Sequence, residues 1–218
     1  MSDTFQVYGH LAGVRHLMYI HKMRFEEDYI YHVYNRGNNQ QTIFFSDNDY
    51  LLFLNNTRKF IYPFCDILAW CLMPNHFHFL IHSNAQTVIC KKVGGLELQQ
   101  LTYGVKQLLS SYAKSINNSQ KRTGNLFQQK TKAKCVNEPN CESYALTAFN
   151  YVHQNPWKAK LVNKIEDWQY SSFRDYLNLR NGKLINKGLA KELIDLDESK
   201  LYKEAYSVIS PELEAKLL

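Results

Sequence analysis

A pair of histidines in the run 70–81 constrains the fold of this chain more than any other feature. The run is apolar at almost every position, apart from a Pro-Asn turn signal and the two histidines that follow it, His76 and His78. A turn signal between two apolar segments predicts an antiparallel hairpin. Because side chains of a strand alternate between its faces, both imidazoles must project from one face and Phe77 from the other.

Two neighbouring imidazoles on one strand face provide half of a site for a divalent metal ion. The same pattern is compatible with histidines that form hydrogen bonds along a polar seam. A short motif does not separate these two interpretations, because such motifs occur by chance in many sequences. The rest of the chain must therefore decide what His76 and His78 do.

Composition excludes several classes of protein. With 218 residues, 45% of them hydrophobic, the chain is long enough for one domain with a true core. Its five cysteines include no CxxC pair, which argues against a disulfide framework or a cysteine-rich zinc site and favours the reducing cytoplasm. No segment approaches the roughly 20 apolar residues of a membrane span. We expect a cytoplasmic, nucleoid-associated protein without a membrane partner.

Positive charge gathers in one segment. The formal net charge is +6, and no acidic residue occurs between Lys114 and Lys134. Lysine and arginine mixed with Gln and Asn suit contact with a phosphate backbone, although a solvated loop has the same composition. The candidate phosphate contacts are Arg36, Lys121, Arg122, Lys130, Lys132 and Lys134.

The periodicity of apolar residues predicts alternating strands and helices. Aromatic and β-branched residues indicate a first strand at 29–34, and Ser46 can cap a helix that runs to about Phe60. The later predicted elements are a central strand 64–73, the histidine strand, a loop 83–95, a helix 96–116, a strand 131–136 and a helix from Asn140 to about Gln154.

This β-α-β-β-α-β order predicts an α+β fold of the ferredoxin-like type, with an antiparallel sheet and helices on one of its faces. The other face would then be free to hold the histidines. We divide the chain into an N-terminal extension (1–25), a ferredoxin-like domain (26–160) and a C-terminal helical appendage (161–218).

The helix after Asn140 supplies a second group of polar residues. Tyr151 and Asn155 are four positions apart and lie on one stripe, and Pro156 is expected to end the helix. The carboxamide oxygen of Asn155 is a suitable third ligand for a hard cation held by two imidazoles. A tyrosine followed by an asparagine at a helix end is also compatible with simple packing and capping.

At this point the chain resembles a known family. Met73–Ile81 is similar to the histidine-hydrophobic-histidine motif of HUH endonucleases with a single catalytic tyrosine. Asn150–Lys158 resembles their Tyr-x-x-x-Gln/Asn helix, in the Tyr-x-x-x-Asn-Pro form of REP-associated tyrosine transposases. Three further segments match that subgroup in order: Tyr31–Gly37, Gly124–Gln128 and Trp168–Tyr176.

The resemblance implies a DNA transposase that cleaves and rejoins single-stranded DNA beside hairpins through a 5′-phosphotyrosine intermediate. His76, His78 and Asn155 look like the ligands of a divalent metal, Mg²⁺ or Mn²⁺. Tyr151 looks like the nucleophile. The partner would be single-stranded DNA with hairpin structure, bound by a monomer or a homodimer.

Two positions depart from the family pattern, and two other functions stay open. Asn155 replaces the Gln of the insertion-sequence branch, and Phe77 is bulkier than the aliphatic residue common between the histidines. A domesticated protein of the same fold would bind single-stranded DNA without cleaving it. A metal-dependent phosphodiesterase would use water in place of Tyr151 as the nucleophile.

Overall fold

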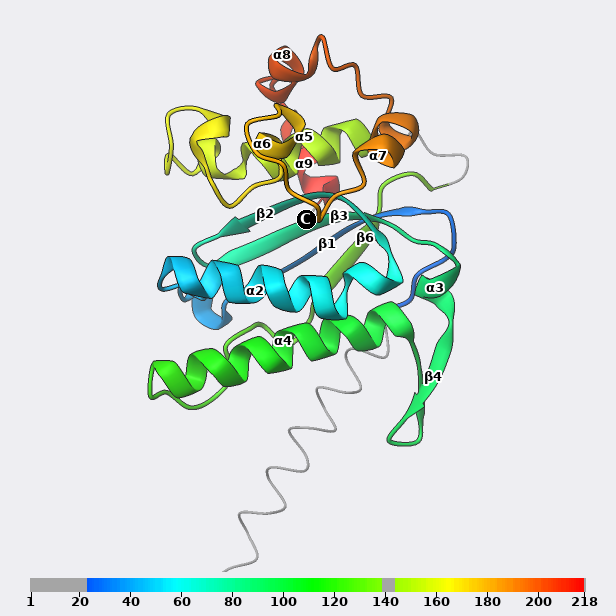
Figure 1. Cartoon of the computed structure of the whole chain (residues 1–218), viewed down its shortest axis with the longest axis vertical. Helices are drawn as coiled ribbons and strands as arrows, with labels where there is room; N and C mark the ends of the chain where they lie inside the picture. The colour runs from blue at the N-terminus through cyan, green and yellow to red at the C-terminus, as the bar shows by residue number, and fades with distance from the viewer. Residues whose placement is uncertain (1–22, 139–143, 218) are drawn as a thin grey trace, which may run out of the picture.

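The centre of the molecule is a sheet of four antiparallel strands in the order β2-β3-β1-β6 (Figure 1). The computed structural model describes residues 23–138 and 144–217 of the chain. The strands are β1 (Ile30–Arg36), β2 (Asp66–Met73), β3 (His76–His82) and β6 (Lys132–Cys135). The first strand and the histidine strand, predicted from the sequence, thus lie side by side in the middle of the sheet.

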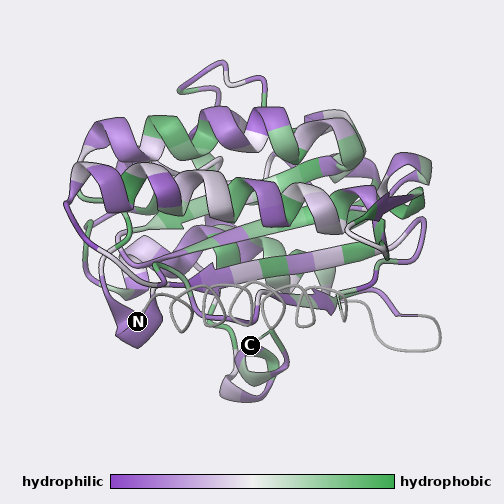
Figure 2. Ribbon diagram, turned by 90° about the horizontal axis from the view of Figure 1, so that it is seen from below, coloured by the Kyte–Doolittle hydropathy of each residue, from purple (hydrophilic) through white to green (hydrophobic). Residues whose placement is uncertain are grey.

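Two long helices cover one face of the sheet and lie side by side (Figure 2): α2 (Asp47–Phe60) and α4 (Gln100–Ser119). A capping box between Ser46 and Asp49 fixes the start of α2. With short 3-10 turns at Asn38–Gln40 and Tyr62–Phe64, the chain follows the predicted β-α-β-β-α-β order, and the ferredoxin-like arrangement is confirmed. No helix in the described part of the chain is long and apolar enough to cross a membrane.

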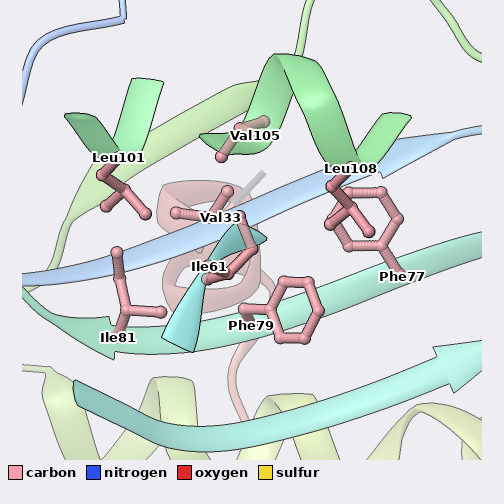
Figure 3. A pocket seen from close by; sticks show the side chains of 8 residues that line it. All are labelled: Val33, Ile61, Phe77, Phe79, Ile81, Leu101, Val105 and Leu108. Carbon is pink, nitrogen blue, oxygen red and sulfur yellow. The ribbon is translucent and has the colours of Figure 1, made fainter. Parts of the chain in front are cut away.

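The first core lies between the sheet and these two helices. Every second residue of β3, namely Phe77, Phe79 and Ile81, points into it and is almost fully buried. The packing leaves a cavity of about 10 Å³, lined only by apolar side chains from the strands, α4 and Ile61 (Figure 3). A dry void of this size has no polar group for water or a ligand to bind.

The second face of the sheet is covered as well. Helix α5 (Ala145–Lys158) packs on β2 and β3, and the segment after it adds further short helices on the same side (Figure 1). These are η3 (Ile165–Asp167), α6 (Phe173–Tyr176), α7 (Lys187–Ile194), α8 (Leu201–Ala205) and α9 (Pro211–Leu217). A second core of buried residues fills this layer. The histidine face, expected to be free, is therefore partly enclosed.

The segment between β3 and α4 differs from the prediction. In place of a loop 83–95 and a helix starting at Leu96, it forms α3 (Ala85–Val88) and a hairpin of β4 (Cys90–Val93) and β5 (Leu96–Gln99). Gly94 and Gly95 adopt positive φ angles of 56° and 81° at the turn, which glycine allows without strain. The helical spacing of apolar residues from Leu96 onwards led to a predicted helix start that is four residues too early, because Leu96–Gln99 belongs to the strand after this glycine turn.

Most of the extension predicted for 1–25 lies outside the described residues. Its last residues pair with the hairpin and the start of α4. Phe25 donates to and accepts from the side chain of Gln99, both at 2.8 Å, and Thr102 donates to the carbonyl of Met23 at 2.8 Å. Met23 and Phe25 are also buried in the first core.

Candidate active site

A cavity of about 390 Å³ on the second face of the sheet contains the four residues of the predicted site. His76 and His78 reach it from β3, and Tyr151 and Asn155 reach it from α5. The full lining is Tyr34, Asn35, Arg36, His76, His78, Gln128, Lys130, Lys132, Tyr151 and Asn155. Residues from an early hairpin and a late helix therefore meet in one place.

The β2-β3 hairpin determines where the histidines lie. A tight turn at Pro74 and Asn75 places His76 at the first position of β3, at the rim of the sheet. The antiparallel register sets Arg36 opposite His76 and Tyr34 opposite His78. Directly opposed residues on one face are near neighbours, so β1 supplies the side chains beside both imidazoles.

His76 is held by the residue before it. Its Nδ1 lies 2.6 Å from Oδ1 of Asn75, and because that oxygen only accepts, Nδ1 carries the proton. The other ring nitrogen, Nε2, is then free of hydrogen, and the ring lies beside the Asn155 side chain. Burial and the nearby Arg36 charge lower the pKa of His76 to about 4, so the ring is neutral at physiological pH.

His78 lies deeper, with 2% of its surface exposed. Its Nδ1 lies 2.8 Å from Nε2 of His32, whereas its own Nε2 is buried without a hydrogen-bond partner among the described residues. Burial, the adjacent His76 and His32, and Arg36 hold the pKa of His78 well below its usual range. A neutral imidazole with a bare, buried nitrogen is the form that binds a metal ion.

Helix α5 does not end at Pro156, as the sequence suggested, but continues to Lys158. Pro156 has no N–H for the carbonyl of Val152, four residues earlier, and the Asn155 side chain compensates for it only in part. Its Nδ2 donates to the carbonyl of Tyr151 at 2.8 Å and approaches that of Val152 at 3.5 Å. The amide nitrogen is thereby turned back to the helix, which leaves the carboxamide oxygen as an acceptor at the cavity.

Tyr151 is 5% exposed and lies against the histidines, with its ring edge-on to His78 at 5.6 Å between centroids. Burial is the main cause that raises the pKa of its hydroxyl, to about 12, and the negative charge of Glu214 adds to it. Lys158 lies 5.7 Å from the Tyr151 ring and pairs with Glu214 at 3.4 Å. The phenol is therefore fully protonated at neutral pH.

The donors in this cavity fit a divalent cation. In the described residues no three His, Cys, Asp or Glu side chains form a metal-binding group, so a site here needs an amide as its third ligand. Two imidazoles and the oxygen of Asn155 form a mixed nitrogen-oxygen set of the kind that Mn²⁺ or Mg²⁺ accepts. The orphaned Nε2 of His78 is the observation that supports this fit.

The predicted basic residues separate into two groups. Arg36, Lys130 and Lys132 line the cavity. Lys121 and Arg122 follow the end of α4, where Arg122 donates to Gln41 Oε1 at 2.8 Å, and neither lines the cavity. Lys134 is outside it too, and its Nζ lies 3.3 Å from the carbonyl of Lys216 in α9. Only the first group surrounds the histidines and Tyr151.

A search of solved structures finds a REP-associated tyrosine transposase bound to a REP hairpin, with a TM-score of 0.53 and 12% identity over 76% of this chain and 87% of that chain. This chain has the fold of that transposase. A bacterial tRNA(His) guanylyltransferase-like protein in complex with GTP also matches, with a TM-score of 0.43 and 11% identity over 71% of this chain and 74% of that one. No protein-family model and no curated protein matches.

The sequence-based prediction missed four residues in or behind the cavity, and two of them, Tyr34 and His32, lie beside His78. Tyr34 lines the cavity, and His32 lies behind His78, fully buried. Both alternate with Val33 along β1, so they share the face of Arg36. The alternation of side chains along the first predicted strand was the sequence signal for these two residues, since it places them on one face with Arg36.

Proposed function

We propose that this protein cleaves and rejoins single-stranded DNA beside a hairpin, as a transposase that forms a 5′-phosphotyrosine intermediate. The observation that carries the proposal is the meeting of His76, His78, Tyr151 and Asn155 in one cavity with a basic rim. The structural neighbour bound to a REP hairpin supports a hairpin DNA as the partner. We further propose that the protein acts in the cytoplasm, associated with the nucleoid. Its active form would be a monomer or a homodimer.

The basic rim would hold the DNA backbone. Arg36 borders the cavity from the end of β1, Lys130 from the segment before β6, and Lys132 from the first position of β6. Contacts of this kind position a phosphate without reading its base, and they contribute most of the affinity for nucleic acid. The scissile phosphate would thus sit between the rim and the Tyr151 hydroxyl.

Tyr151 would then act as the nucleophile. Its Oη forms a bond to phosphorus while the bond from phosphorus to the 3′ oxygen breaks, and the phenolic proton ends on the leaving 3′ oxygen. His76, His78 and Asn155 would hold a divalent cation, Mg²⁺ or Mn²⁺, which when bound neutralises charge on the phosphate. The Arg36 charge offsets part of the rise in the pKa of Tyr151 and so favours the developing phenolate.

Rejoining reverses this step. A 3′ hydroxyl attacks the phosphotyrosine, the bond from phosphorus to Tyr151 Oη breaks, and the phenol regains a proton. Because the phosphodiester energy is kept in the protein–DNA bond, no nucleoside triphosphate is required. This property suits strand exchange better than degradation.

An adduct assay tests the proposal. The full chain is incubated with Mn²⁺ and single-stranded hairpin DNA taken from the flanks of its own gene, and products are resolved under denaturing conditions. We expect a covalent protein–DNA band that Tyr151→Phe abolishes. Tyr144→Phe is the matched control, because Tyr144 precedes the same helix but donates to the carbonyl of Cys135 at 2.9 Å, outside the cavity lining.

The burial of Tyr151 favours a second candidate function, a protein of this fold that binds single-stranded DNA without cleaving it. A nucleophile with 5% of its surface exposed and a pKa of about 12 is poorly prepared for attack. Tight binding with neither adduct nor cleavage would support this candidate. Cleavage that persists in Tyr151→Phe would instead indicate a hydrolase that uses water.

A further inference from the structure

One fully buried histidine next to the site has no part in the chemistry proposed above. His32, in the middle of β1, has 0% of its surface exposed. Its Nδ1 lies 2.9 Å from the carbonyl oxygen of Leu217 in α9, and its Nε2 lies 2.8 Å from Nδ1 of His78. Both ring nitrogens are therefore used, one on each side of the ring.

These two contacts determine where the protons are. A carbonyl oxygen only accepts, so the His32 Nδ1 that faces Leu217 must carry a hydrogen. In the neutral ring Nε2 then has none and must accept. The 2.8 Å contact consequently requires the hydrogen to be on Nδ1 of His78.

The consequence reaches the cavity. With its hydrogen on Nδ1, His78 has a bare Nε2, the same atom that is buried without a partner in the described structure. The opposite order of protons would put an N–H at this position, which excludes a cation. The ring of His32 is stacked on His78 at 5.0 Å and on Tyr34 at 4.8 Å, so its orientation is fixed on both sides.

We propose that His32 is a positioning residue that holds His78 in the tautomer and orientation needed to bind a divalent cation through Nε2. The inference rests on the metal site of the proposed function. His76 provides a parallel, because Oδ1 of Asn75 accepts a hydrogen bond from its Nδ1 and fixes the proton there. The proton position of His76 is thus fixed by the preceding residue. That of His78 is fixed by His32 of β1 and, through it, by Leu217 of α9. Groups that orient a metal-binding histidine in this way contribute about 10- to 100-fold to metal affinity.

Three variants of the full chain test the assignment by Mn²⁺ binding, followed by the EPR signal of the free ion. His32→Leu removes the acceptor and should weaken Mn²⁺ binding by about 10- to 100-fold. His32→Gln can accept from His78 and donate to Leu217, and should restore most of the affinity. His153→Leu is the matched control: His153 is equally buried, bonded to Ser172 at 2.8 Å outside the cavity lining, and its loss should leave Mn²⁺ binding unchanged.

A second measurement needs no variant, no metal and no DNA. Long-range ¹H–¹⁵N NMR of the metal-free protein should find the His78 proton on Nδ1. A proton on Nε2, or a His32→Leu protein that binds Mn²⁺ as tightly as the original, would overturn the inference. If the proton is on Nδ1 but the protein binds no Mn²⁺, the metal site of the proposed function is wrong, whereas the control of the tautomer by His32 stands.

Discussion

The two faces of strand β3 have opposite chemistry, although they belong to the same seven residues. On one face Phe77, Phe79 and Ile81 pack into the first core, and β3 contributes no ionisable side chain to that core. On the other face His76 and His78 line a cavity with charged residues at its rim. Because side chains alternate along a strand, residues one position apart enter these two different environments.

This difference teaches how the protein combines a stable sheet with a polar, partly desolvated site. The core under α2 and α4 supplies burial, so the second face can accommodate neutral imidazoles and an unpartnered nitrogen. Substitutions one residue apart should then act on different properties. Those on the first face should reduce stability, and those on the second should reduce chemistry.

The largest effect is expected for His76→Ala. Loss of a metal-binding imidazole should abolish formation of the DNA adduct, below the limit of detection, while affinity for single-stranded DNA falls little because phosphate contacts dominate it. Adduct formation on denaturing gels and fluorescence anisotropy with labelled DNA measure the two properties. Simultaneous loss of binding and stability would mean that His76 supports the fold and not a cation.

Phe77→Ala, one residue away, should have the converse effect. Its ring is 1% exposed and contacts Phe53 and Phe127, so truncation should leave a cavity and lower the free energy of unfolding by about 3–5 kcal/mol. Urea titration measures this loss. At a temperature where the variant is still folded, its rate of adduct formation should stay within a few-fold of the original, and a complete loss of adduct would contradict the separation of the two faces.

The sequence predicted this two-faced strand because the determining pattern is local. A period of two and a turn signal are sufficient to place His76 beside His78 and to separate them from Phe77. Likewise, the spacing of four between Tyr151 and Asn155 needs only helix geometry. The resemblance to transposases then correctly predicted that the two pairs would meet.

What the sequence did not predict depends on contacts between distant segments. The bond from His32 to Leu217 joins residues 185 positions apart, and no local period encodes it. The extension of α5 past Pro156 leaves the Val152 carbonyl with a long contact of 3.5 Å to Asn155 Nδ2, so the packing of the helix in the second core must maintain it. The cover over the histidine face arises from short helices with weak individual signals, which are stabilised by packing on the sheet.

A smaller effect, on acid stability, should also distinguish the faces. His32 and His153 belong to the second face, and burial lowers their pKa values from 6.5 to about 4 and about 3. Below pH 6.5 the unfolded chain binds protons that the folded protein does not, so stability should fall as the pH decreases towards 4. Each histidine contributes a slope of about 1.4 kcal/mol per pH unit.

Urea titrations at pH 7, 6 and 5 measure this slope, and His153→Leu should reduce it by the contribution of one proton. The comparison uses slopes, so it does not depend on how much the substitution itself destabilises the protein. An unchanged slope in His153→Leu would mean that His153 binds its proton equally well in the folded and unfolded protein. Phe77→Ala is the first-face control, since it removes no titratable group and should leave the slope as it is.

The smallest effect concerns the two groups of basic residues. Lys132 lines the cavity, whereas Lys121 follows α4 on the other side of the sheet. If DNA runs through the cavity, Lys132→Gln should decrease the slope of log affinity against log salt by about 0.7, the value for one phosphate contact of a single strand. Lys121→Gln removes the same charge and is the matched control, with an expected change near zero. Equal changes in both variants would mean that the DNA path extends beyond the cavity to the end of α4, and that the separation of the two faces does not apply to DNA binding.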